Sequence, residues 1–188
     1  AEKIAAWILK GGILFSEGCP GYLDGYCSAG TVQPNLGLDK VFGVKECDVE
    51  FTQDILQDEQ FPWEDRFFYG GEYLQSYRLE GASELLEGKN KRTLAAENRY
   101  GLGRAFLIGT SPALGYSNHP CDEQKDLFRW IAGIMKLEAH TSCENPKVCA
   151  RIQTYGEALF LWLINGEHSA QNTKIRLEGQ YEFDEVEK

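Results

Sequence analysis

The sequence predicts an α/β domain over residues 1–137, followed by the start of an all-β module over residues 138–188. Three observations support this order. The chain opens with a helical apolar pattern that leads into an apolar strand. A β-hairpin pattern and then an amphipathic helix end the first part, and near residue 148 apolar and polar side chains begin to alternate as in strands.

The first expected element is a helix at the start of the chain. Ile4, Trp7 and Ile8 recur at helical spacing, and Gly11-Gly12 supplies a stop. The next three residues, 13–15, are all apolar, which is typical of a strand buried on both faces of a sheet. Helix, glycine stop and buried strand together predict half of a parallel α/β unit.

A long loop is expected over residues 18–37, which contain five glycines and two prolines. A loop of this length in a compact domain usually has a function or a partner. Residues 36–44, "LGLDKVFGV", predict a short helix with a glycine exit, and residues 47–52 predict a strand. Residues 53–66 are acidic and rich in turn formers.

The strongest local pattern is "TLAAENRYGLGRAFLIG", residues 93–109. It predicts a β-hairpin whose turn is made from Asn98, Gly101 and Gly103, with a second strand over 105–108 in the centre of a sheet. Asp122 is placed to begin a helix, where a carboxylate complements the helix dipole. One face of this helix is apolar and comprises Leu127, Phe128, Ile131, Ile134 and Met135.

The character of the sequence changes near residue 138. "AHTSCENPK" resembles a linker, alternation over 148–153 predicts a strand, and residues 158–164 and 174–177 predict two more. Three strands leave one face open, so this module stops before it closes a core. Together with the opening on a helix that no strand precedes, this predicts that the chain is a piece of a larger protein.

Composition excludes several classes of function. The net charge of −10 opposes binding to nucleic acid or to anionic membranes, and no apolar run reaches the roughly 20 residues of a membrane span. The six cysteines include no C-x-x-C pair, which argues against a closed zinc site. We expect free thiols in a reducing compartment, the cytoplasm, and no metal or cofactor.

Three segments resemble the middle domain of the β-galactosidases of glycoside hydrolase family 42. They are "GGILFSEGCPGYLDGYCSAGTVQPNLGLDKVFGVKECDVEFTQDIL" (11–56), "FYGGEYLQSY" (68–77) and "ENRYGLGRAFLIGTSPALGY" (97–116). In that family this trimerisation domain follows a catalytic barrel and precedes a small β domain. The resemblance implies that residues 1–137 are such a domain, incomplete at the N-terminus, and that residues 138–188 begin the β domain.

The resemblance also implies function and partners. The parent protein would be a homo-oligomer, a trimer, that cleaves terminal β-galactosides with retention by means of barrel carboxylates outside this chain. This segment would then be non-catalytic. Chance carboxylate pairs are easy to find among 29 acidic residues, and Glu17, Glu50, Glu72 and Glu97 are expected in turns and at sheet edges.

Such middle domains are similar in fold to the class I glutamine amidotransferases, which are flavodoxin-like sandwiches with a catalytic cysteine. Cys19 follows the first predicted strand, with Gly21 two residues later, and His119 lies late in the domain. A thiol activated by a histidine would be a nucleophile, so a cysteine-dependent amidotransferase-like enzyme is the alternative function.

Several features argue against that enzyme. The residue after the nucleophile supplies a backbone N–H to the oxyanion hole of such a turn, and here it is Pro20, which has none. Glu17 replaces the first glycine of the turn and should raise the pKa of the thiol. The His-Pro-Glu motif has become His119-Pro120-Cys121.

A second alternative is a carbohydrate-binding module. Aromatic side chains in loops can stack on sugars or fill a subunit interface. The same side chains can instead pack on the chain's own core. The candidate interface or sugar-facing residues are Tyr22, Tyr26, Trp63, Phe67 and Tyr69.

Overall fold

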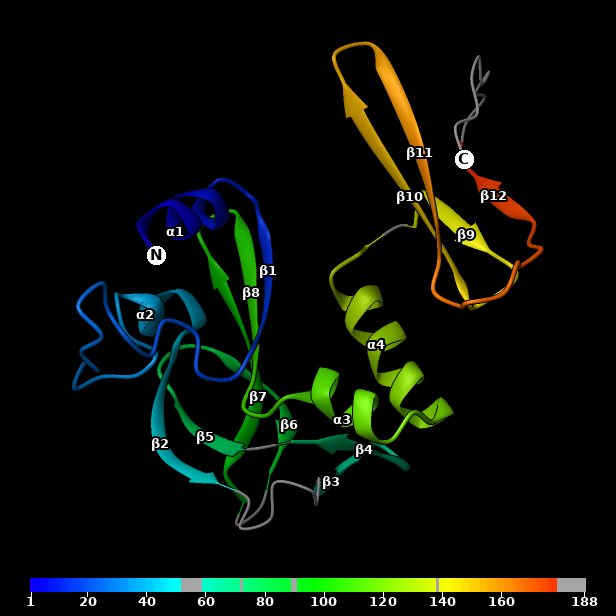
Figure 1. Cartoon of the computed structure of the whole chain (residues 1–188). Coiled ribbons are helices and arrows are strands. Elements are labelled where there is room, and N and C mark those ends of the chain that lie inside the picture. Colours follow the sequence, from blue (N-terminus) through cyan, green and yellow to red (C-terminus); the bar gives the residue numbers. More distant parts are fainter. Residues whose placement is uncertain (52–58, 72, 89–90, 138, 179–188) are drawn as a thin grey trace. The chain divides into compact units, whose positions relative to one another are not determined.

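A computed structural model of the 188-residue chain describes residues 1–51, 59–71, 73–88, 91–137 and 139–178. The chain divides into two compact units, unit 1 (Ala1–Lys136) and unit 2 (Leu137–Lys188). Each unit is described by itself (Figure 1).

Unit 1 is built around a six-stranded mixed sheet. Five strands follow the order β1-β8-β7-β5-β2, and β6 pairs with β7 beside them. Only β1 and β8 run parallel; the other pairs described in this sheet are antiparallel. The elements of unit 1 are α1 (Glu2–Leu9), β1 (Ile13–Glu17), α2 (Leu38–Phe42), β2 (Val44–Phe51), β3 (Glu59–Trp63), β4 (Arg66–Gly70), β5 (Tyr73–Leu79), β6 (Ser83–Glu87), β7 (Thr93–Tyr100), β8 (Gly103–Ile108), α3 (Pro112–Asn118) and α4 (Asp122–Ile134).

The predicted flavodoxin-like, amidotransferase-like α/β sandwich is therefore wrong. That fold needs parallel strands joined by helical crossovers of a dozen or more residues. Here β5, β6, β7 and β8 follow one another through connections too short for a crossover, so they pair antiparallel. The described chain has twelve strands and four helices, so it is mainly a β structure.

The first strand also differs from its expectation. β1 pairs only with β8 and lies at the edge of the sheet, and all five of its residues are half-buried. An apolar run of three residues does not distinguish a central strand from an edge strand that a helix and a loop partly cover.

The two faces of the sheet carry separate apolar clusters. Helices α1 and α2 lie on one side of β1 and β8, and α3 and α4 lie on the other (Figure 1). The cluster under α1 and α2 includes Ile8, Phe42 and Leu107. The other includes Phe68 of β4 and Leu127 of α4. Covering both faces buries the strands at the sheet centre, so Leu94, Ala105 and Phe106 expose 1 % of their surface or less.

Several local expectations are confirmed. β7 and β8 form the predicted antiparallel hairpin, and Gly101 takes the left-handed conformation at its turn with φ of 63°. Helix α2 ends at Gly43, also left-handed. Asn98 is not a turn residue: it lies within β7, and its side-chain amide donates to the carbonyls of Lys40 and Val41 at the end of α2.

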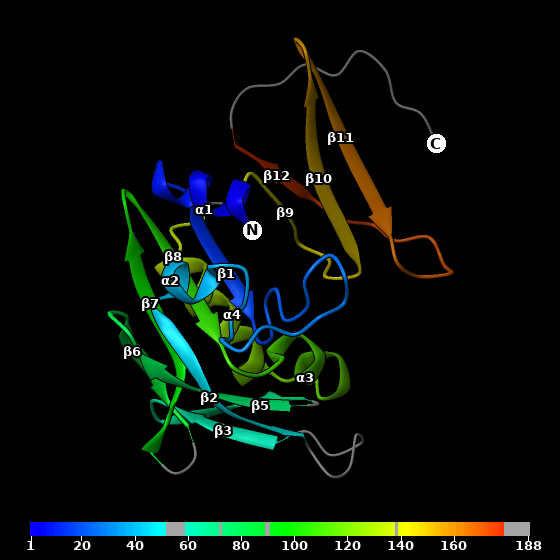
Figure 2. The same ribbon diagram turned by 90° about the vertical axis from the view of Figure 1, so that its left-hand side faces the viewer.

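Unit 2 contains β9 (Thr141–Cys143), β10 (Val148–Tyr155), β11 (Ala158–Asn165) and β12 (Ile175–Leu177). β10 and β11 form a long antiparallel hairpin (Figure 2). The predicted third strand is present as β12, but it pairs with β9 instead of with the hairpin.

Candidate functional site

The turn that carries Cys19 lies at the carboxyl end of β1, beside the end of the parallel strand β8. Cys19 has φ of 56°, a left-handed conformation that a side chain adopts at some cost. A Cβ on Gly18 before it would lie 2.5 Å from Cε2 of Tyr73, so a larger residue there would displace the Tyr73 ring.

The turn is held by Gln75, a fully buried residue of β5. The backbone N–H of Cys19 donates to Oε1 of Gln75 at 2.8 Å, and the hydroxyl of Tyr77 donates to the same oxygen. The Nε2 of Gln75 donates to the carboxylate of Glu46 on β2. Sequence reasoning missed Gln75 and Glu46, because neither belongs to a motif and three separate segments have to meet before the network exists.

This environment makes Cys19 a poor nucleophile. Burial is the main cause that raises the pKa of its thiol, and the negative charge of Glu46 raises that pKa further. The thiolate is the reactive form, so a raised pKa leaves Cys19 protonated near neutral pH. Burial likewise holds the pKa of the neighbouring Tyr77 well above its usual value.

Two backbone groups that could serve an oxyanion are missing or already bonded. Pro20 has no N–H, and the N–H of Cys19 is already bonded to Gln75. Loss of one oxyanion donor lowers a rate by about a hundred- to a thousandfold. The backbone geometry of a nucleophile turn is present, but a lowered thiol pKa and the usual oxyanion donors at Cys19 and the residue after it are not.

Glu17 serves the start of a helix instead of the thiol. Its carboxylate accepts from the hydroxyl of Ser111 at 2.6 Å and from the N–H of Ala113 at 3.0 Å, in the first turn of α3. A carboxylate at a helix N-terminus is favourable because it satisfies unpaired N–H groups and meets the positive end of the dipole. The raised pKa of Cys19 is therefore due to burial and Glu46, and not to Glu17 as the sequence suggested.

His119 follows α3 and has a different neighbour. Its ring stacks on that of Tyr69, with centroids 4.5 Å apart. The neighbours of Cys19 include Gln75, Glu46, Tyr22 and Tyr77.

The five aromatic candidates have different settings. Trp63 is 4 % exposed and packs against Trp130 in the core of unit 1. Phe67 and Tyr69 are half-buried in β4 and meet edge to face. Tyr26 is 91 % exposed at the outside of the β1–α2 loop, and Tyr22 of the same loop is half-buried. Of the five, Tyr26 is thus the one most open to a partner.

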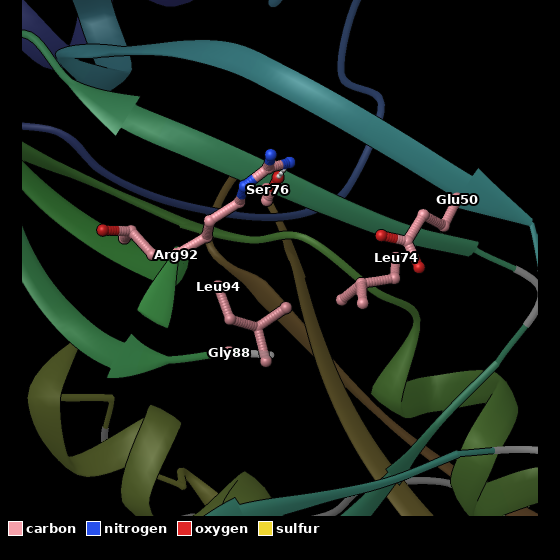
Figure 3. A pocket seen from close by; sticks show the side chains of 7 residues that line it. Glu50, Leu74, Ser76, Gly88, Arg92 and Leu94 are labelled. Carbon is pink, nitrogen blue, oxygen red and sulfur yellow. Dashed lines mark hydrogen bonds between the residues drawn. The ribbon is translucent and has the colours of Figure 1, made fainter. Parts of the chain in front are cut away.

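The remaining acidic candidates have structural neighbours or lie outside the described residues. Glu97 forms an ion pair with Arg104 at 2.5 Å. Glu50 lines a cavity of about 10 Å³ with Arg92 and Leu94 (Figure 3), which is only the size of a water site. Glu72 lies outside the described residues.

The part of the chain that the structure describes has neither an evident metal site nor a membrane-spanning helix. It contains no group of three or more histidine, cysteine or acidic side chains placed to hold a metal ion. None of its helices has the length and apolar character needed to cross a membrane.

Solved structures of β-galactosidases have the fold of this chain. The cold-adapted β-galactosidase of Rahnella sp. R3 superposes over 87 % of the chain with a TM-score of 0.67 and 21 % identity. Gan42B, a family 42 β-galactosidase from G. stearothermophilus, superposes over 95 % with a TM-score of 0.68 and 14 % identity. A β-galactosidase from the haloarchaeon Halorubrum lacusprofundi matches 68 % at a TM-score of 0.54 and 15 % identity. No protein-family model and no curated protein matches the sequence.

The predicted likeness to family 42 β-galactosidases is thus confirmed at the level of the fold. The chain spans only about a quarter of the length of the Rahnella and G. stearothermophilus enzymes, 25 % in each case.

Proposed function

We propose that this chain is the non-catalytic oligomerisation segment of a β-galactosidase-like glycoside hydrolase whose catalytic barrel lies outside it. The observation that carries the proposal is the match of nearly the whole chain to a quarter of a family 42 β-galactosidase. In this proposal unit 1 is the trimerisation domain and unit 2 begins the small β domain. The partners are further copies of the parent protein, and its substrates are β-galactosides.

The condition of the Cys19 turn supports a non-catalytic role. A nucleophile at this position needs a depressed pKa and an oxyanion hole. The thiol instead has a raised pKa, the N–H of Cys19 is bonded to Gln75, and Pro20 after it has no N–H. Glu17 and Glu97, two of the acidic side chains that could be drawn into a glycosidase pair, are engaged with α3 and Arg104.

Two measurements on the 188-residue chain test the proposal. Hydrolysis of a chromogenic β-galactoside should not exceed the blank, with an intact family 42 enzyme as the positive control. Sedimentation equilibrium should show self-association that rises with concentration. Galactosidase activity in the chain alone, or a strictly monomeric chain at high concentration, would contradict the proposal.

The alternative of a cysteine-dependent enzyme has one observation in its favour, the left-handed conformation of Cys19 at a strand end. It predicts rapid labelling of Cys19 by iodoacetamide that does not change with pH near neutrality. The proposal made here predicts slow labelling that accelerates as the pH rises.

A further inference from the structure

We propose that unit 1 binds a small neutral polyol, of the size of a single sugar, in a pocket between the β1–α2 loop and strands β2 and β5. The pocket encloses about 450 Å³, which lies within the usual range of about 300–1,000 Å³ for small-molecule sites. Its lining is mostly polar. The side chains that the argument uses are Tyr22, Gln33, Lys45, Glu46 and Arg78.

A buried acceptor without a donor is the first observation that points to a ligand. Gln33 is only 7 % exposed, and its Nε2 donates to the carbonyls of Tyr22 at 3.0 Å and Gly30 at 3.4 Å. Those two bonds fix which end of the amide is the nitrogen. The other end, Oε1, is buried and has no hydrogen-bond partner among the described residues. Since buried polar atoms are nearly always paired, a ligand that donates to this oxygen would complete the site.

The charges of the lining favour a neutral ligand. Lys45 and Arg78 both pair with Glu80, at 3.5 Å and 3.0 Å. The hydrogen bond from Arg78 and the charge of Lys45 lower the pKa of Glu80, so that carboxylate stays ionised and, together with Glu46 in the lining, offsets the two cations. The site therefore does not require an anion, and the same two cations oppose a cationic ligand.

Glu46 supplies a second acceptor in the lining. Its Oε2 accepts from Gln75, and its other oxygen has no recorded partner in the part of the chain that the structure describes. Tyr22 lies close enough that the charge of Glu46 is the main cause of the raised pKa of its hydroxyl. Gln33 and Glu46, which carry acceptors, thus line the same pocket as Lys45 and Arg78, which carry donors.

Hydroxyl groups match this mixed lining, because each one both donates and accepts. A polyol can donate to Gln33 and Glu46 and accept from Lys45 and Arg78, while Tyr22 adds an aromatic wall. The pocket needs neither a catalytic barrel nor a second copy of the chain, so its test is independent of the proposed function.

The test is a ¹H–¹⁵N NMR titration of the full chain with methyl β-D-galactopyranoside. We expect saturable shifts of the amides at Gly30, Thr31, Gln33 and Glu46, with a dissociation constant of about 1 mM, as befits a ligand with few non-hydrogen atoms. Absence of saturable shifts up to about 100 mM, a hundredfold above that constant, would overturn the proposal.

A pair of tryptophan variants locates the site. Thr31→Trp places a bulky ring in the pocket and removes no recorded hydrogen bond, so it should weaken binding at least tenfold. Ser28→Trp, at an exposed position of the same loop outside the lining, should bind as the parent does. Circular dichroism verifies that both variants are folded. Unchanged binding by Thr31→Trp would contradict this site.

A competing ligand decides its chemistry. An amino acid zwitterion would place its ammonium on the acceptors and its carboxylate on the cations. If L-glutamine saturated the same amides at a lower concentration than the sugar, the polyol assignment would be wrong. Failure of L-glutamine to shift these amides in the range where the sugar saturates would support it.

Discussion

At the scale of single residues, the Cys19 turn shows how a reactive geometry can be present without reactivity. The left-handed backbone at Cys19 is stabilised by the bond from its N–H to Gln75, and that same bond occupies a potential oxyanion donor. Pro20 was readable from sequence as a missing donor. The engagement of the Cys19 N–H could not be read from the sequence. Its acceptor, Gln75, is a buried residue that lies 56 residues further along the chain.

The first prediction concerns the reactivity of Cys19. Replacing Glu46 by glutamine removes a negative charge that raises the pKa of the thiol, while an amide oxygen can still accept from Gln75. The pKa of Cys19 should fall, so the thiolate fraction near pH 8 should rise. We expect alkylation of Cys19 by iodoacetamide to become several-fold faster, measured by peptide mass spectrometry.

The other cysteines supply the control for that experiment. Exposed Cys27 should label at the same rate in both proteins, since it is not part of the Gln75 network. In the parent protein Cys19 should label more slowly than Cys27, and its rate should still be rising at a pH above the ordinary value for a thiol. Equal acceleration at both cysteines would show a general loosening of the fold instead of an electrostatic effect.

At the scale of elements, Gln124 joins three parts of unit 1. It is fully buried in α4, accepts from the N–H of Tyr69 at 2.7 Å, and donates to the carbonyls of Tyr69 and Pro112 at 2.8 Å each. The sequence predicted α4 from its apolar face, but a glutamine within that helix gave no sign that it bonds the backbones of β4 and α3. The helix was predictable because its apolar pattern is local. The hydrogen bonds from Gln124 to β4 and α3 were not predictable, because they join segments that are distant in the sequence.

The second prediction tests these hydrogen bonds of Gln124. Gln124→Leu keeps the volume roughly constant but removes three hydrogen bonds to backbone groups, and each buried group left unpaired costs about 1–3 kcal/mol. Allowing for the gain from a buried leucine, we expect the free energy of unfolding to fall by about 3 kcal/mol in urea titrations. The neighbouring control Lys125→Ala removes an exposed ion pair with Asp122 and should leave the free energy of unfolding nearly unchanged. Equal losses in the two variants would refute the role of Gln124.

The third prediction compares two glycines with opposite surroundings. A Cβ on Gly109 would lie 1.9 Å from the carbonyl oxygen of Gln75, a backbone atom that cannot move away alone. Gly109→Ala should therefore destabilise unit 1 by at least about 3 kcal/mol. Gly133 in α4 has no atom within 4 Å of its Cβ position, so Gly133→Ala should stabilise by about 0.5–1 kcal/mol through helix propensity. Thermal denaturation of both variants checks the two signs.

The class of the sheet shows where sequence reasoning stops. The β7–β8 hairpin was predicted from its alternation and its glycine turn, which are local signals. The parallel pairing of β1 with β8 joins strands about 90 residues apart, so it has no local signal. The parallel sheet was expected instead from the helix and strand that open the chain and from the resemblance. Strands β5 and β6 were not predicted, and their short connections are what make the rest of the sheet antiparallel. The β3–β4 hairpin was also missed, because its strands lie in and beside a stretch whose acidic, turn-rich composition suggested loops.

At the scale of the whole molecule, the two units differ in how much core they hold. Unit 1 contains both apolar clusters. Among the described residues of unit 2, Val148 is the only buried apolar side chain. The β10–β11 hairpin instead exposes Phe160, Trp162 and Ile164, which are 48 %, 54 % and 55 % accessible. A two-stranded hairpin without a buried face is marginally stable in water.

The last prediction follows from this difference and uses the intact chain. Local opening of β10–β11 should cost far less free energy than opening of β7–β8, whose residues Leu94, Ala105 and Phe106 are buried. Native-state hydrogen exchange should show protection factors at least about 100-fold lower in β10–β11 than in β7–β8.

The comparison should be made at low protein concentration and repeated at high concentration. Similar protection of the two hairpins at low concentration would contradict this prediction. The apolar face of β10–β11 would then have to be buried, and the described residues of unit 2 do not bury it. A rise in the protection of β10–β11 with concentration would instead locate self-association at this hairpin, since burying its three large side chains would stabilise it.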